Sequence, residues 1–209
     1  MRSVLTAVLI LTVVLAPAGI ALAGPSAHLI LQSEPGDPIG GGGTFDLTYT
    51  PENSTFFAAE ALLLIGPSPS ALFFGLGSIT PDNTSLSMFF ETAGLGIPIE
   101  PGFYPDANRA FASPDHPGFS IGFRNVGCGS LTGEFTIDHL TFSAGPTIET
   151  FGVRFEQHCD GIEPALFGTF EYAASTDVRV AAPPTLALLG SALAGLLGAA
   201  AAWTRLPRR

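Results

Sequence analysis

The C-terminal segment restricts the possible structures of this chain more than any other part of it. Residues 185–203 form a block of 19 residues made almost wholly of Leu, Ala and Gly, and no charged residue occurs between Arg179 and Arg205. As a helix rising about 1.5 Å per residue, the block spans about 30 Å, the thickness of a bilayer core. A buried core helix would carry a polar face, whereas this block offers only Thr185 and Ser191. We therefore predict a transmembrane helix over 185–203.

The residues that follow this block give its orientation. Trp203 stands at the end of the block, where an interfacial aromatic side chain is typical of membrane helices, and Arg205, Arg208 and Arg209 follow it. Positive residues next to a membrane helix remain on the cytoplasmic side and stop its transfer. The tail is therefore predicted to stay inside the cell, and the chain before the helix to face outward.

The N-terminal segment 1–23 has the three parts of a secretory signal peptide. Arg2 is its only charged residue, positions 4–15 are apolar except for two threonines, and the segment ends on an A-x-A pattern at Ala23. An uncleaved membrane anchor is the alternative, but a proline and a glycine break the apolar run well short of the roughly 20 residues that span a bilayer. We predict export through the Sec translocon and cleavage between Ala23 and Gly24.

The residues around the start of the apolar block also match a known sorting signal. The matching positions are Val180, Pro183, Pro184, Thr185, Leu186, Ala187, Leu188, Leu189 and Gly190. With the helix and the closing arginines, they resemble the PEP-CTERM signal of exopolysaccharide-producing Gram-negative bacteria, in which a Val-Pro-Glu-Pro motif precedes the helix. Ala181 and Ala182 stand where that motif has its first Pro and its Glu. The resemblance implies processing by exosortase, a membrane protease-transpeptidase; without processing, segment 178–209 is a permanent membrane anchor.

The stretch between these two segments, 24–177, has the size of one domain. Apolar and polar residues alternate along several short runs, as they do in strands with one buried face. Other runs are apolar throughout, which indicates strands buried on both faces, although 56–64 could also be a short helix. Turn sequences separate the runs, and the glycines at 40–43 are predicted to form a flexible turn. The predicted strands are 29–31, 44–50, 56–65, 71–79, 86–90, 119–124, 134–138, 151–156 and 166–172.

This pattern predicts an all-β domain, either an antiparallel β-sandwich or a jelly roll. The 17 phenylalanines suit such a core, because a large rigid ring fills the space between two packed sheets. The stretches 104–109, 127–135 and 155–161 resemble a module that recurs in secreted bacterial proteins. That resemblance implies a secreted β domain and no particular activity.

The chain has two cysteines, Cys128 and Cys159, and both lie in the part predicted to be exported. In an oxidising compartment an isolated pair is expected to form a disulfide. A metal site or a reactive thiol is the weaker alternative, since no C-x-x-C spacing occurs. We predict a disulfide between Cys128 and Cys159.

The charge of the domain restricts its partners. All 18 acidic residues lie within 24–177 beside only three arginines, and the chain has no lysine, so the formal charge of the domain is −15. Nucleic acids are bound through clusters of Lys and Arg, so the composition argues against a nucleic-acid partner. The acidic surface could collect calcium, but the sequence has no EF-hand loop pattern.

No sequence motif indicates catalysis or metal binding. The histidines have no H-x-H or H-E-x-x-H spacing, and the side chains of Asp138 and His139 are expected on opposite faces of a strand. We interpret Gln157, His158 and Asp160 as polar groups that bond the backbone at the end of a strand. The sequence has no G-x-S-x-G elbow and no phosphate-binding loop. We predict no catalytic site, no metal and no cofactor.

These observations predict a non-enzymatic cell-envelope or extracellular-matrix protein, exported to the outer face of the membrane or the surface of a Gram-negative bacterium. Its expected partners are membrane lipid, the Sec translocon, an exosortase and extracellular polysaccharide. A carbohydrate-binding module or a secreted hydrolase on the same β domain is the alternative. The domain has three Tyr and no Trp to stack on a sugar, and no catalytic motif, so the sequence favours the first interpretation.

Overall fold

The structure, a computed structural model, describes residues 24–62, 64, 68–112, 114–143, 146–161 and 163–175. The predicted signal peptide and the PEP-CTERM-like segment, including its predicted helix at 185–203, lie outside these residues. Among the residues that are described, no helix is both long and apolar enough to cross a membrane.

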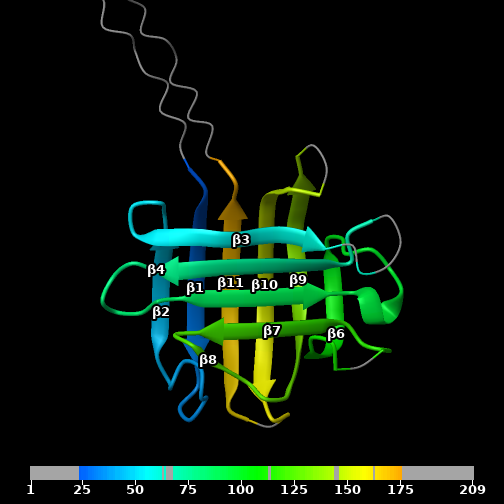
Figure 1. Cartoon of the computed structure of the whole chain (residues 1–209). Coiled ribbons are helices and arrows are strands. Elements are labelled where there is room, and N and C mark those ends of the chain that lie inside the picture. Colours follow the sequence, from blue (N-terminus) through cyan, green and yellow to red (C-terminus); the bar gives the residue numbers. More distant parts are fainter. Residues whose placement is uncertain are drawn as a thin grey trace, which may run out of the picture.

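Strands make up nearly all of the regular structure of the described residues (Figure 1). They are β1 (Ser26–Ser33), β2 (Thr44–Tyr49), β3 (Ser54–Leu62), β4 (Ala71–Ser78), β5 (Leu86–Glu91), β6 (Gly102–Arg109), β7 (Gly118–Phe123), β8 (Val126–Gly127), β9 (Leu131–Phe142), β10 (Ile148–Cys159) and β11 (Ala165–Ala173), with one short 3-10 helix, η1 (Ala93–Leu95). The all-β class is confirmed. The helical alternative for 56–64 is wrong, because residues 56–62 belong to β3, which pairs with β4.

The strands form a single sheet in the order β2-β1-β11-β10-β9-β6-β7-β5-β4-β3, with β8 paired to β7. This sheet folds over on itself into a back layer (β2, β1, β11, β10, β9, β6) and a front layer (β7, β8, β5, β4, β3), whose strands cross steeply in Figure 1. Every described pairing is antiparallel except that of β6 with β7, where Asn108 pairs with Gly118 and Arg109 with Phe119. The sheet is therefore mixed, not purely antiparallel as predicted. The parallel pair lies where the back layer, through β6, joins the front layer, through β7.

The core lies between the two layers and is built largely from aromatic rings. The ring of Phe74 on β4 has its centroid 4.9 Å from that of Phe151, 5.2 Å from Phe170 and 5.3 Å from Tyr172, all on the back layer. Burying each such ring contributes about 1.5–3 kcal/mol of hydrophobic free energy. Gly168 on β11 leaves space for the ring of Phe155 on β10, because a Cβ at position 168 would overlap that ring. Aromatic packing across the layers therefore holds the sheet in its folded-over form.

The two ends of the domain lie side by side. Strands β1 and β11 are neighbours in the sheet, and Ser26 near the start of the domain pairs with Ala173 near its end. Strand β11 has nine residues, so at about 3.3 Å per residue its other end is about 30 Å away. That far end carries Cys159 and the loop that follows β1. We call the two ends of the domain the terminal end and the disulfide end.

Candidate functional site

The outer face of the back layer carries most of the ion pairs of the described residues. The Arg154 guanidinium donates to both carboxylate oxygens of Asp138, at 2.9 and 2.7 Å. This bidentate contact holds the pKa of the Asp138 carboxyl below its usual value. The other pairs on this face are His28 with Asp46 at 2.7 Å, His139 with Glu171 at 3.3 Å, and His158 with Glu156 at 2.8 Å.

The prediction that Asp138 and His139 point to opposite faces is wrong. Strand β9 has an irregularity in its register with β10 at this position: Ile137 pairs with Val153 and His139 pairs with Gly152, leaving Asp138 as an extra residue. A β-bulge of this kind breaks the alternation of side chains. Asp138 and His139 therefore both reach partners on the outer face, but these partners are different residues.

A polar groove of about 460 Å³ lies where β6, β9 and β10 meet. Glu134 and Glu156 are register partners on β9 and β10, so the groove has two carboxylates directly across from each other. The Glu156 carboxylate bonds the His158 ring, and the His116 ring lies 2.9 Å from the carbonyl oxygen of Asp106. The remaining lining residues are Ala107, Asn108, Thr132 and Gly133. The lining residues thus include two histidines, His116 and His158, and three acidic residues, Asp106, Glu134 and Glu156, which can form hydrogen bonds with a polar ligand.

The groove has no arrangement suited to a metal ion. Among the described residues, no group of three or more His, Cys, Asp or Glu side chains is placed to hold one. His158 already has two carboxylate neighbours, with Glu163 at 3.6 Å on its other ring nitrogen. Its partners are thus side chains, and the interpretation of His158 as a residue that bonds the backbone is wrong.

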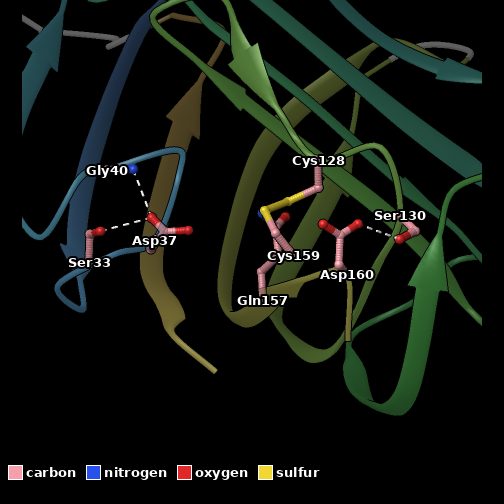
Figure 2. The surroundings of a disulfide bond; sticks show 8 residues. All are labelled: Ser33, Asp37, Gly40, Cys128, Ser130, Gln157, Cys159 and Asp160. Carbon is pink, nitrogen blue, oxygen red and sulfur yellow. Dashed lines mark hydrogen bonds between the residues drawn. A yellow bond between two sulfur atoms is a disulfide. The ribbon is translucent and has the colours of Figure 1, made fainter. Parts of the chain in front are cut away.

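The disulfide end is held together by a small polar network (Figure 2). Cys128 and Cys159 are joined in a disulfide, with their Cα atoms 5.3 Å apart. Gln157 is fully buried beside them and donates from Nε2 to the Cys128 sulfur at 3.2 Å. The Asp160 carboxylate accepts from the Ser130 hydroxyl at 2.8 Å. Gln157 and Asp160 therefore bond side chains where backbone partners were predicted, although β10 does end at Cys159.

The loop at 40–43 is anchored, whereas a flexible turn was predicted. Asp37 is buried, and its Oδ2 accepts from the Ser33 hydroxyl at 2.8 Å and from the Gly40 amide at 2.7 Å (Figure 2). Ser33 in turn accepts from the amide of Gly42 at 2.9 Å. Gly41 and Gly42 have positive φ angles of 61° and 81°, which glycine adopts readily. The glycines therefore form a tight turn around the buried carboxylate of Asp37.

The outer face of the front layer is aromatic, a feature that sequence reasoning missed. The runs in β3, β4 and β5 were expected to be buried on both faces, but Phe57 is 63% exposed and Phe73 and Phe89 are partly exposed. The signal that could have found them is the doublet Phe-Phe, which occurs at 56–57, 73–74 and 89–90. Consecutive side chains in a strand point to opposite faces, so each doublet places one ring outside the core.

Comparison with known proteins adds no relative: no family model, curated protein or solved structure matches this chain. The PEP-CTERM resemblance and the resemblance of 104–172 to a secreted module therefore stay predictions.

Proposed function

We propose that this chain is an exported cell-envelope or extracellular-matrix protein of a Gram-negative bacterium. Its signal peptide, 1–23, is removed, and its segment 178–209 either tethers the β domain to the outer face of the membrane or directs its sorting by exosortase to the cell surface or matrix. The observation that carries the proposal is the Cys128–Cys159 disulfide, because structural disulfides persist in oxidising compartments outside the cytoplasm. The charge of −15 on 24–177 adds to it, since an acidic surface keeps a displayed domain dispersed.

The arrangement of the domain ends fits attachment at one side. Ser26 and Ala173 pair at the terminal end, so a membrane helix after the domain leaves it beside the mature N-terminus. The disulfide end then points away from the membrane, with the polar groove on the same half of the domain.

The C-terminal segment can act in two ways, and one experiment distinguishes them. In the first, exosortase cleaves near Pro183 and Pro184 and releases the domain to the cell surface or matrix. In the second, helix 185–203 remains as an anchor, consistent with Ala181 and Ala182 in place of the Pro and Glu of the usual motif. Mass spectrometry of the mature chain distinguishes them by the presence or absence of residues after Pro184.

Cell fractionation tests the proposal as a whole. We expect the mature chain to begin at Gly24, to be cut by protease added to cells with a permeabilised outer membrane, and to be absent from the cytosol. A matched variant that ends at Pro184 should be exported but not retained by the inner membrane. A chain that keeps Met1 and collects in the cytosol would refute export.

A further inference from the structure

Three phenylalanines, Phe73, Phe89 and Phe111, form a row of neighbouring rings on the outer side of the front layer and the turn after β6, and a fourth, Phe57, is exposed on β3. We call Phe57, Phe73, Phe89 and Phe111 the aromatic face. The ring centroids of Phe73 and Phe89 are 6.2 Å apart, and those of Phe89 and Phe111 are 4.7 Å apart. Phe57 is 63% exposed and Phe111 is 69% exposed. Large contiguous exposed apolar patches on folded domains mark interaction sites or ligand-binding grooves.

A shallow groove of about 410 Å³ runs beside Phe57 on this face. Its polar lining comes from Ser85, Ser87 and Asn125. Glycines keep it open: a Cβ on Gly75 would overlap the ring of Phe57, and a Cβ on Gly122 would come within 2.6 Å of the Ser87 hydroxyl. The groove therefore offers an aromatic ring together with hydroxyl and amide groups.

The charge of this face selects among partners. The outward positions of β4, β5 and β7 hold Phe, Gly, Ser and Ala, with one carboxylate, Glu91, which is 4% exposed. Because the domain carries −15, an acidic polymer or a second copy of the chain would be repelled as it approached. An uncharged partner meets no such repulsion.

We infer that the aromatic face binds a neutral polysaccharide. A pyranose ring has an apolar face of C–H groups, which stacks on exposed aromatic rings, and a rim of hydroxyls, which suits the Ser87 hydroxyl and the Asn125 amide. The aromatic rings carry the contact, and the hydroxyl and amide groups in the groove beside Phe57 orient the sugar. The inference rests on the proposed function insofar as an exported domain meets such polymers outside the cell.

Binding is tested with the full chain purified in lipid nanodiscs. The probes are the neutral oligosaccharides cellohexaose, laminarihexaose and a galactomannan oligosaccharide, with hexagalacturonate as the acidic counterpart, measured by titration calorimetry. We expect at least one neutral probe to bind and hexagalacturonate not to bind. Phe57→Ala and Phe111→Ala should each weaken binding by about fivefold to tenfold. Phe103→Ala is the matched control, because Phe103 is 57% exposed on the other layer and should leave binding unchanged.

Several results would overturn the inference. Absence of binding by all neutral probes does so, as does binding that Phe57→Ala and Phe111→Ala leave intact. A third is a wild-type dimer in sedimentation analysis that Phe57→Ala dissociates in the absence of any sugar binding, since the face would then join two copies. All of these measurements use purified protein and do not depend on where the chain is located in the cell. Sugar binding can therefore be refuted while export is confirmed, and export can be refuted while sugar binding is confirmed.

Discussion

Ser26 lies directly opposite Ala173 on the paired strands β1 and β11. The first and last strands of the domain are thus hydrogen-bonded neighbours in the middle of the back layer. This pairing fixes both ends of the domain at one side and leaves the disulfide end about 30 Å away.

Removing the disulfide should destabilise the domain substantially. Cys128 and Cys159 are separated by 31 residues in sequence, and closing a loop of this length contributes about 3–4 kcal/mol in the chain-entropy model. We expect the double variant Cys128→Ala, Cys159→Ala to lose about that much unfolding free energy in urea titrations. A loss below about 1 kcal/mol would show that the loop is already constrained in the unfolded chain.

Gly168 should tolerate no larger residue. The ring of Phe155 occupies the position that a Cβ on Gly168 would need, so Gly168→Ala should cost about 1–3 kcal/mol through overpacking. Gly129 is the matched control, because a Cβ there would meet no atom within 4 Å, and Gly129→Ala should leave stability nearly unchanged. Equal unfolding midpoints for the two variants would contradict this packing.

Tyr49 couples stability to alkaline pH. Its hydroxyl donates to the carbonyl oxygen of Thr84 at 2.8 Å, and burial raises the pKa of the phenol above its ordinary value of 10.0. Because the folded pKa lies above the unfolded one, the stabilisation is complete below pH 10 and declines as the pH rises beyond it. Tyr49→Phe should cost about 1 kcal/mol at neutral pH, and its deficit should shrink above pH 10.

Urea titrations of both proteins over a series of pH values measure this change. Tyr104 and Tyr172 are also buried with raised pKa values, so the wild type should continue to lose stability at high pH through all three phenols. A deficit in Tyr49→Phe that stays constant above pH 10 would contradict burial of the Tyr49 phenol.

The pair of Asp138 and Arg154 should act in the opposite pH range. Hydrogen bonds from Arg154 lower the pKa of Asp138 in the folded domain below its ordinary value of 3.8. The ion pair therefore stabilises the folded domain above pH 3.8, and this stabilisation is lost as the pH falls through the pKa that Asp138 has in the folded state. Both side chains are partly exposed, so the effect is small. We expect Asp138→Asn to melt slightly below the wild type at pH 7, and the two melting temperatures to converge in acid. Thermal scans at several pH values measure this, and a constant difference would contradict it.

The strands were predictable because their signal is local. Alternation along 44–50 or 151–156 reports which side chains face the core, and β2 and β10 lie there. Strand β6 was missed: Pro105 interrupts its pattern, and its register with β9 shifts between Tyr104 and Ala107. A strand with a proline and a register shift lacks the regular alternation of apolar and polar residues by which the other strands were predicted.

Features that depend on contacts between distant strands could not be read from the chain. The parallel pairing of Asn108 with Gly118 turns the sheet into a second layer, and nothing in the local pattern indicates it. Likewise, the extra residue Asp138 becomes visible only against the register of β10. The polar groove combines β6, β9 and β10, so its residues are brought together by topology and not by spacing in the sequence.

Export of the domain is tested most directly by thiol trapping in the native host. Cells are quenched in acid, and the denatured chain is treated with a maleimide polymer that adds mass to each free cysteine. We predict no mass increase at Cys128 or Cys159 without reductant, and an increase at both after reduction. Modification of both cysteines without reductant would contradict an oxidised, exported domain.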